Sequence, residues 1–273
     1  MSIALIVVYN AFVKNKTAYI TDYLRKLTNA IHGWTALDEL AFLYRTAQLQ
    51  KKGGVIVEIG SWQGRSTVCM AKGSEHGNGA RIYAIDPFTG SSENQIPGVK
   101  IWTRDDFERN LEKTDTKALV TTLAMTSDDA AKSWDRPIDF LFIDGAHEYE
   151  YVKNDFLLFS PYVVDGGIIA FHDTTPNLKA ILQGLPLFGL PGPRQVVWEY
   201  VFKQRTFKNI GLSGSILYAT KCNANSFADR LKNNLCGLEM LAKYMVYALY
   251  VRLKKIPGPI KSLLKPIKSS FSR

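Results

Sequence analysis

Apolar and polar positions alternate along this chain in a way that predicts strands and helices in turn. Short apolar runs rich in β-branched residues predict strands at 55–59, 81–86, 119–124, 138–143, 167–172, 195–201 and 214–220. Helical spacing of apolar residues predicts helices at 64–73, 103–113, 127–133, 149–159 and 176–183. Such alternation is typical of an α/β fold. We therefore expect a mostly parallel seven-stranded sheet with helices on both faces, and antiparallel pairing at its last strand.

Two further helical patterns occupy residues 17–50, and Thr35 is the predicted N-cap of the second. Residues 3–8 predict a short strand at the N-terminus. The pattern divides the chain into an N-terminal extension (1–50), an α/β domain (51–222) and a C-terminal appendage (223–273).

The run 55–59 leads into a glycine turn with the pattern Glu58-x-Gly60-x-x-x-Gly64, and a helical segment follows. Such a strand-turn-helix unit lets a ligand touch bare backbone. The next predicted strand ends at Asp86, and an acid about 20 residues past such a turn suits the hydroxyls of a ribose. The two features together predict a site for a nucleoside cofactor.

Details of the turn argue against a dinucleotide. The dinucleotide fingerprint would have glycines where Trp62 and Arg65 stand, and Glu58 would repel a phosphate. S-adenosylmethionine has a ribose, an amine and a sulfonium, and it lacks a phosphate. The turn and Asp86 resemble those of the class I S-adenosylmethionine-dependent methyltransferases, which have a Rossmann-like fold. The resemblance implies a cofactor site at Glu58, Gly60, Ser61, Gly64, Asp86 and Ser127.

A second group of polar residues follows two later strands, as Asp144 ends one and His172-Asp173 ends the next. Adjacent parallel strands lie about 5 Å apart, so both carboxylates can meet at one edge of the sheet. Two neighbouring carboxylates repel unless one is protonated or a cation lies between them. A hard divalent ion suits this pair, and His172 is a candidate further ligand.

The sequence Ile143-Asp144-Gly145-Ala146-His147-Glu148-Tyr149, with Phe171-His172-Asp173-Thr174, is similar to one methyltransferase subgroup. This subgroup contains macrolide-sugar and rhamnosyl O-methyltransferases and relatives of cephalosporin-biosynthesis proteins. The resemblance implies that Asp144 and Asp173 bind magnesium and that His147 is the catalytic base. Sugar-modifying members often have two acids where this chain has His172-Asp173, so another ion, or none, is an open alternative.

Charge is concentrated at the end of the chain. Residues 229–273 include ten basic and two acidic residues, a net charge of +8 out of +9 for the chain. The nearly neutral remainder argues against a nucleic-acid partner. Apolar and basic residues mixed in the appendage predict either contact with a membrane surface or packing on the body or on a second copy. Three dispersed cysteines suit a reducing compartment, and no signal or spanning segment is expected.

These features predict a cytoplasmic methyltransferase, peripheral to the cell membrane or free of it. Its expected reaction is metal-assisted O-methylation of a sugar hydroxyl in a glycan or a glycosylated small molecule. An alternative keeps the cofactor but changes the acceptor to a catechol or another small phenol. Another is a non-catalytic membrane-associated binding or scaffold protein with the same fold. Homo-oligomerisation is also an open expectation.

Overall fold

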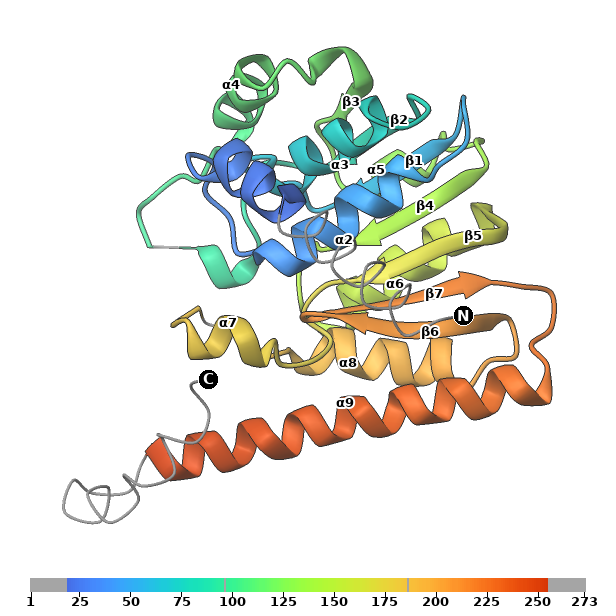
Figure 1. The fold of residues 1–273 in the computed structure, drawn as a ribbon. Coiled ribbons are helices and arrows are strands. Elements are labelled where there is room, and N and C mark those ends of the chain that lie inside the picture. Colours follow the sequence, from blue (N-terminus) through green and yellow to red (C-terminus); the bar gives the residue numbers. More distant parts are fainter. Residues whose placement is uncertain (1–18, 96, 186, 255–273) are drawn as a thin grey trace, which may run out of the picture.

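The computed structural model describes residues 19–95, 97–185 and 187–254, and it contains one seven-stranded sheet (Figure 1). The strands are β1 (Val55–Ile59), β2 (Arg81–Ile85), β3 (Val120–Leu123), β4 (Ile138–Ile143), β5 (Val163–Phe171), β6 (Phe207–Ser213) and β7 (Ile216–Lys221). Their order in the sheet is β3-β2-β1-β4-β5-β7-β6, and β7 pairs antiparallel with both of its neighbours. The predicted α/β fold, with its antiparallel last strand, is confirmed.

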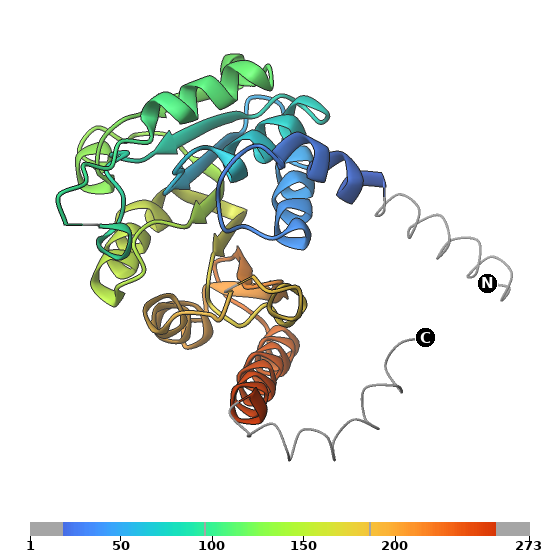
Figure 2. The same cartoon turned by 90° about the vertical axis from the view of Figure 1, so that its left-hand side faces the viewer.

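Helices cover both faces of this sheet (Figures 1 and 2). A first helix spans residues 19–28. It is followed by α2 (Leu37–Gln48), α3 (Arg65–Glu75), α4 (Arg104–Lys113), α5 (Ser127–Ala131), α6 (Tyr149–Phe159), α7 (Leu178–Leu182), α8 (Pro191–Val197) and α9 (Phe227–Lys254). Single helical turns lie at Ser92–Asn94, Lys117–Leu119 and Ser160–Tyr162, and a wide helical turn lies at Trp198–Phe202.

Alternate residues of the central strand β4 point to two different cores. Phe140 and Phe142 pack with buried side chains of α2, α3 and α4. Leu141 and Ile143 pack with those of α5, α6, α8 and α9. This two-residue period is what a strand imposes, and burying each such side chain contributes about 1.5–3 kcal/mol. A strand apolar on both faces therefore fixes β4 in the middle of the molecule.

The strand predicted at 195–201 is wrong, because these residues belong to α8 and the wide helical turn after it. Val196, Val197 and Val201 all face one core, a spacing that suits a helix rather than a strand. Pro191 occupies the first turn of α8, where proline needs no amide partner. The edge strand that pairs with β7 is β6, which lies after residue 201 in the chain.

The N-cap of α2 also differs from the prediction. It is Ala36 rather than Thr35, and the Glu39 side chain accepts a hydrogen bond from the Ala36 amide at 2.7 Å. The predicted strand at 3–8 and the last 19 residues of the appendage lie outside the described residues. None of the helices described here has the length and apolarity needed to cross a membrane.

The long helix α9 lies along the edge strand β6 (Figure 1). Its buried Asn233 donates to the carbonyl of Phe207 at 3.1 Å and accepts from the amide of Ile210 at 3.3 Å. The Asn225 side chain donates to the same carbonyl at 2.8 Å. The side chains of Asn225 and Asn233 therefore satisfy hydrogen-bonding groups of the edge-strand backbone.

Candidate active site

A cavity of about 470 Å³ opens beyond the carboxyl ends of β1, β2, β4 and β5. Eight of the predicted site residues line it: Gly60, Ser61, Asp86, Ser127, Asp144, His147, His172 and Asp173. The other two do not line it: Glu58 is buried beneath the glycine turn, and Gly64 ends the turn as the N-cap of α3. A ligand at the carboxyl ends of parallel strands is the usual arrangement in open α/β sheets.

Gly60 allows the turn to approach the neighbouring strand closely. Its φ is 87°, and a Cβ there would lie 2.2 Å from the carbonyl oxygen of Asp144. Gly64, with a φ of 86°, is the N-cap of α3. Any side chain at Gly60 would therefore push apart the two strands that form the cavity floor.

Glu58 is completely buried beneath this turn. One of its carboxylate oxygens accepts hydrogen bonds from the hydroxyls of Ser61, at 2.9 Å, and Thr67. The other, Oε1, has no partner among the described residues. Burial raises the pKa of Glu58 to about 7, although the hydroxyls of Ser66, Thr67 and Ser61 oppose that shift.

Asp86 fixes the other side of the turn. Its Oδ2 accepts from the amides of Ser61 and Trp62, both at 2.8 Å, and its Oδ1 accepts from the amide of Phe88 at 2.6 Å. Burial raises the pKa of Asp86, and the three amides oppose the rise. A carboxylate has about four lone-pair sites, so one remains for a ligand hydroxyl.

Ser127 is the first residue of α5, and Thr126 is its N-cap. The Ser127 hydroxyl donates to Asp155 at 2.5 Å. Burial raises the pKa of Asp155 to about 7. Asp155 lines the cavity, and the sequence analysis did not include it in the site.

At the mouth of the cavity, Asp144, His147 and Asp173 each offer a ligand atom, and these atoms lie within 4.8 Å of one another. His147 Nε2 is 3.5 Å from Asp173 Oδ2. Its other ring nitrogen, Nδ1, is 2.8 Å from a carboxylate oxygen of Glu93. Glu93 was missed in the sequence because it lies 54 residues before His147, in a single helical turn without a recognisable motif.

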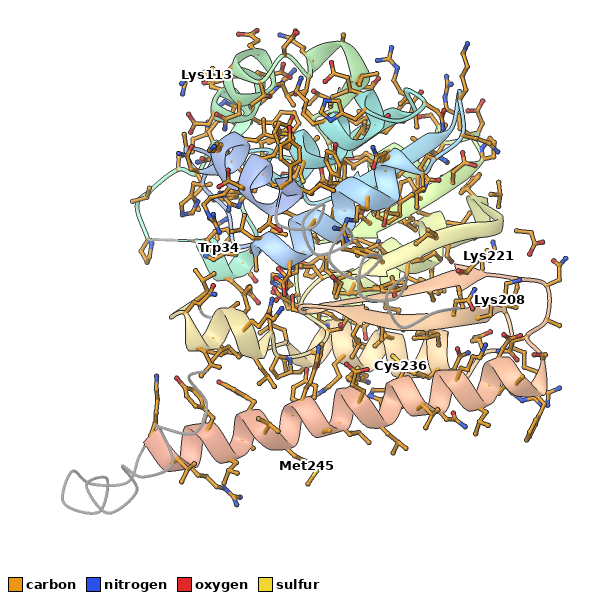
Figure 3. All side chains as sticks on the ribbon, in the orientation of Figure 1. Trp34, Lys113, Lys208, Lys221, Cys236 and Met245 are labelled. Atoms are coloured by element: carbon orange, nitrogen blue, oxygen red, sulfur yellow. The ribbon has the colours of Figure 1, made fainter. Side chains whose placement is uncertain are left out.

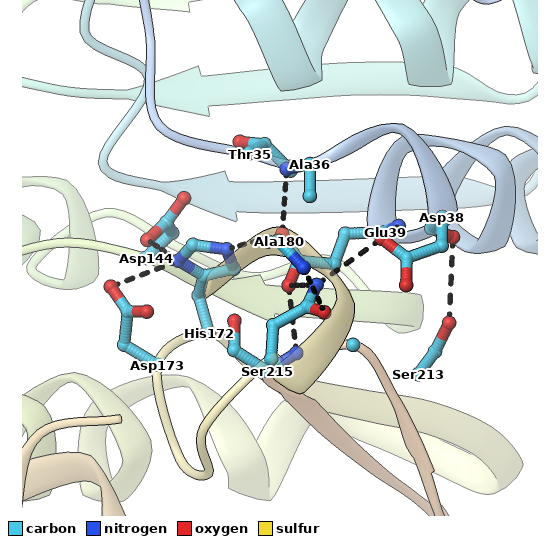
Figure 4. A network of polar contacts seen from close by, with 12 residues as sticks. Thr35, Ala36, Asp38, Glu39, Asp144, His172, Asp173, Ala180, Ser213 and Ser215 are labelled. Carbon is cyan, nitrogen blue, oxygen red and sulfur yellow. Dashed lines mark hydrogen bonds and ion pairs between the residues drawn. The ribbon is translucent and has the colours of Figure 1, made fainter. Parts of the chain in front are cut away.

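His172, which we predicted as a further metal ligand, lies beside the two carboxylates of the predicted site. Its Nδ1 lies 3.0 Å from Asp144 and 3.2 Å from Asp173, and its Nε2 lies 3.2 Å from Glu39 (Figure 4). Burial alone would lower the pKa of His172, but the charges of Asp144 and Asp173 raise it well above its usual value. With carboxylates at both ring nitrogens, His172 is a buried counter-ion of Asp144 and Asp173.

Glu39 completes this network from α2. It accepts hydrogen bonds from the Asn177 side chain at 2.8 Å and from the Ser215 amide at 2.7 Å (Figure 4). Burial raises the pKa of Glu39, but the hydrogen bond and charge of His172, together with the amides of Ser215 and Ala36, leave the pKa lowered overall. Its position three residues into the helix after Ala36 is the signal that marks it as a capping residue.

Aromatic side chains form one wall of the cavity. Trp34 and Trp62 have ring centroids 5.5 Å apart, and the Trp62 indole donates to His32 at 3.1 Å. Trp34 remains 43% exposed, and it projects from the loop before α2 (Figure 3). A ring-shaped acceptor could stack against such a wall.

The cavity is acidic, since Asp86, Glu93, Asp144, Asp155 and Asp173 all line it. Arg65 also lines it, but its guanidinium donates to the backbone carbonyls of Thr28, Ile31 and Thr35. These carboxylates suit a ligand with a positive group and hydroxyls, and their negative charge disfavours a phosphate.

Residues 57–174 match a family model described as a methyltransferase domain. The O-methyltransferase NovP has a similar structure, with a TM-score of 0.52 and 16% identity over 69% of this chain and 81% of that chain. The fold is that of the class I methyltransferases. An O-methyltransferase from Bacillus cereus, in complex with SAH, gives a TM-score of 0.51 and 18% identity over 74% of this chain and 91% of its own.

Among curated proteins, the uncharacterized protein R132 of Acanthamoeba polyphaga mimivirus is 30% identical over 161 residues, which is 58% of this chain. The chain spans 66% of that relative and 13% of another, the uncharacterized protein y4gI of Sinorhizobium fredii (strain NBRC 101917 / NGR234).

Proposed function

We propose that this protein transfers a methyl group from S-adenosylmethionine to a hydroxyl of a sugar ring. The observation that carries the proposal is the acidic cavity beyond the glycine turn, with a histidine–carboxylate pair at its mouth. The methyltransferase-domain match over residues 57–174 supports the reaction class. The choice of a sugar follows from the resemblance of the Asp144–His147 and His172–Asp173 segments to sugar O-methyltransferases.

The cavity residues suit the parts of the cofactor. Asp86 would accept from the ribose hydroxyls, and Ser127 with Asp155 would face the adenine. The acidic lining, with Glu58 beneath the turn, would favour the amine and the sulfonium. When bound, S-adenosylmethionine supplies an electrophilic methyl group, so the protein mainly has to position the acceptor and remove its proton.

His147 is the proposed base. Its Nδ1 is held by Glu93, which leaves Nε2 to take a proton from an acceptor hydroxyl at the cavity mouth. Asp144 and Asp173 would hold a divalent cation, whose charge would favour the deprotonated hydroxyl. The same pair could hold a catechol acceptor through a cation, so a catechol is the second acceptor to test.

Calorimetry of S-adenosylmethionine binding to the wild type and to Asp86→Ala, with and without magnesium, tests the cofactor. We expect micromolar binding to the wild type and at least about a tenfold loss in the variant, because a hydrogen bond to a charged group contributes about 1.5–3 kcal/mol. Lack of binding to the wild type under both conditions would contradict the proposal and favour a non-catalytic scaffold.

Acceptor screening then separates the two chemistries. Incubation with labelled cofactor and either glycosylated compounds or catechols should label the former. Labelling of catechols alone would contradict the choice of a sugar while leaving the methyltransferase proposal intact.

A further inference from the structure

Helix α9 has two apolar faces, and only one of them packs on the body. Asn233, Cys236 and Met240 are buried against the sheet and its helices. The opposite side carries a row of exposed large apolar residues: Phe227, Leu231, Leu235, Leu238, Leu241, Met245, Val246, Leu249 and Leu253. Figure 3 shows Met245, which is 73% exposed, pointing away from the body, whereas Cys236 points toward it.

This exposed face is long and wide. Its apolar positions recur every three or four residues along all 28 residues of α9, so they share one side of the helix. Adjacent positions such as Met245 and Val246 widen the face beyond the narrow seam of a two-stranded coiled coil. An apolar surface of this extent on a monomer marks an interaction site.

Charge around α9 indicates which partner suits the face. Arg252 and Lys254 end the helix, and the sequence that follows, 255–273, has five basic residues and no acidic ones. A second copy packed parallel along α9 would bring another strongly basic end to the same surface, and like charges would repel. Anionic lipid headgroups are complementary to these charges, and the acyl region is complementary to the apolar face.

A neighbouring apolar segment contacts the body-facing side of α9. Phe188 is 41% exposed and stacks on Tyr247 of α9, with ring centroids 5.4 Å apart. Leu182 and Leu185, on the same segment, are exposed, and Leu187 lines the cavity. Tyr247 lies two helical turns after the buried Met240, so this segment is separate from the outward face of α9.

We propose that the outward face of α9 docks on an anionic lipid membrane, with its apolar residues in the interface and the basic residues at its C-terminal end on the headgroups. Docking does not depend on the catalytic proposal, since it uses none of the residues assigned to methyl transfer.

Vesicle flotation of the full chain tests this proposal. The wild type should float with vesicles made of equal parts of phosphatidylcholine and phosphatidylglycerol. A much smaller fraction of the protein should float with vesicles of phosphatidylcholine alone. Binding should weaken as salt is added, because salt screens the headgroup charge. The double variant Leu238→Glu/Leu249→Glu should bind at least about tenfold more weakly, since two apolar anchors become acidic.

The matched control is Leu49→Glu/Leu157→Glu, which makes the same change at two exposed leucines, one directly after α2 and one on α6. It should float like the wild type, and circular dichroism should show all three proteins folded. Equal flotation of the α9 variant and the control would overturn the proposal, as would lack of wild-type binding to anionic vesicles. A wild-type dimer that the α9 variant breaks, without flotation, would assign the face to a second copy.

Discussion

The proposed chemistry depends on a pair of residues, His147 and Glu93, whose side chains meet at 2.8 Å. His147→Ala should lower kcat by about 10²–10⁴-fold, the usual contribution of a general base, and leave S-adenosylmethionine binding unchanged. Glu93→Gln should lower kcat less, because the ring loses its orienting charge but keeps its nitrogens. Steady-state kinetics and calorimetry measure both effects.

His76→Ala is the control for these variants, since His76 lies at the exposed end of α3. It should leave kcat unchanged. An active His147→Ala enzyme would assign proton removal to another group.

Glu58 should make stability depend on pH. Its pKa rises from about 4.5 to about 7 on folding, so between these values the folded protein binds more protons than the unfolded chain. The free energy of unfolding should therefore fall as pH increases through this window, by on the order of 3 kcal/mol from Glu58. Glu58→Gln should remove this part of the slope in urea unfolding at pH 5 and pH 8.

Glu150→Gln, at an exposed residue of α6, is the control and should keep the wild-type slope. A Glu58→Gln slope equal to that of the wild type would mean that Glu58 is ionised in the folded protein throughout this range.

The sequence predicted the acids that follow strands, because parallel strands of one sheet end at one edge. Asp86, Asp144 and Asp173 therefore meet as expected. Glu93 and Glu39 were not predicted, since they reach the site from loops and helices far away in the sequence. The role of His172 also required the structure, because only there does Glu39 appear on its second nitrogen, 133 residues distant in sequence.

At the scale of elements, the junction between the β1 turn and the end of β4 requires a glycine. Gly60→Ala would force an alanine into a left-handed backbone conformation, which costs about 1–2 kcal/mol. Its Cβ would also clash with the backbone of Asp144. Gly79→Ala is a matched control, with a φ of 72° and open space at its Cβ. We expect urea unfolding to show a loss for Gly60→Ala about 1–3 kcal/mol larger than for Gly79→Ala. Equal losses would mean that the turn relaxes without cost.

The elements themselves were predictable where one pattern dominated. β4 is apolar on both faces, and its prediction was confirmed with the same bounds. The segment 195–201 misled because valine and aromatic residues favour strands in isolation, yet here they pack in a helix. The true strand, β6, was hidden because its pairing with β7 shifts register between Lys208 and Gly211, which breaks the alternation.

At the scale of the whole molecule, Glu39 connects segments that are distant in sequence. It joins the start of α2 to β5 through His172, to the β6–β7 turn through Ser215, and to α7 through Asn177. Glu39→Ala would leave His172 Nε2 and the backbone amides of Ala36 and Ser215 without their buried partner. We expect a loss of about 3–5 kcal/mol in the free energy of unfolding, the usual cost of breaking a buried ion pair.

Denaturant unfolding measures this loss, and Glu75→Ala, at a partly exposed ion pair on α3, should cost less than about 1 kcal/mol. A Glu39→Ala protein as stable as the control would show that the network contributes nothing to holding these segments together.

The contacts that Asn225, just before α9, and Asn233, within it, make with β6 affect how copies of this chain can meet. An open edge strand invites another strand to add to it, which is a common route to aggregation. Here the carbonyl of Phe207 and the amide of Ile210 already have partners in the side chains of Asn225 and Asn233. While α9 stays in place, a strand of another molecule cannot pair with β6 at these positions. The helix therefore also protects this edge of the sheet against aggregation by strand addition.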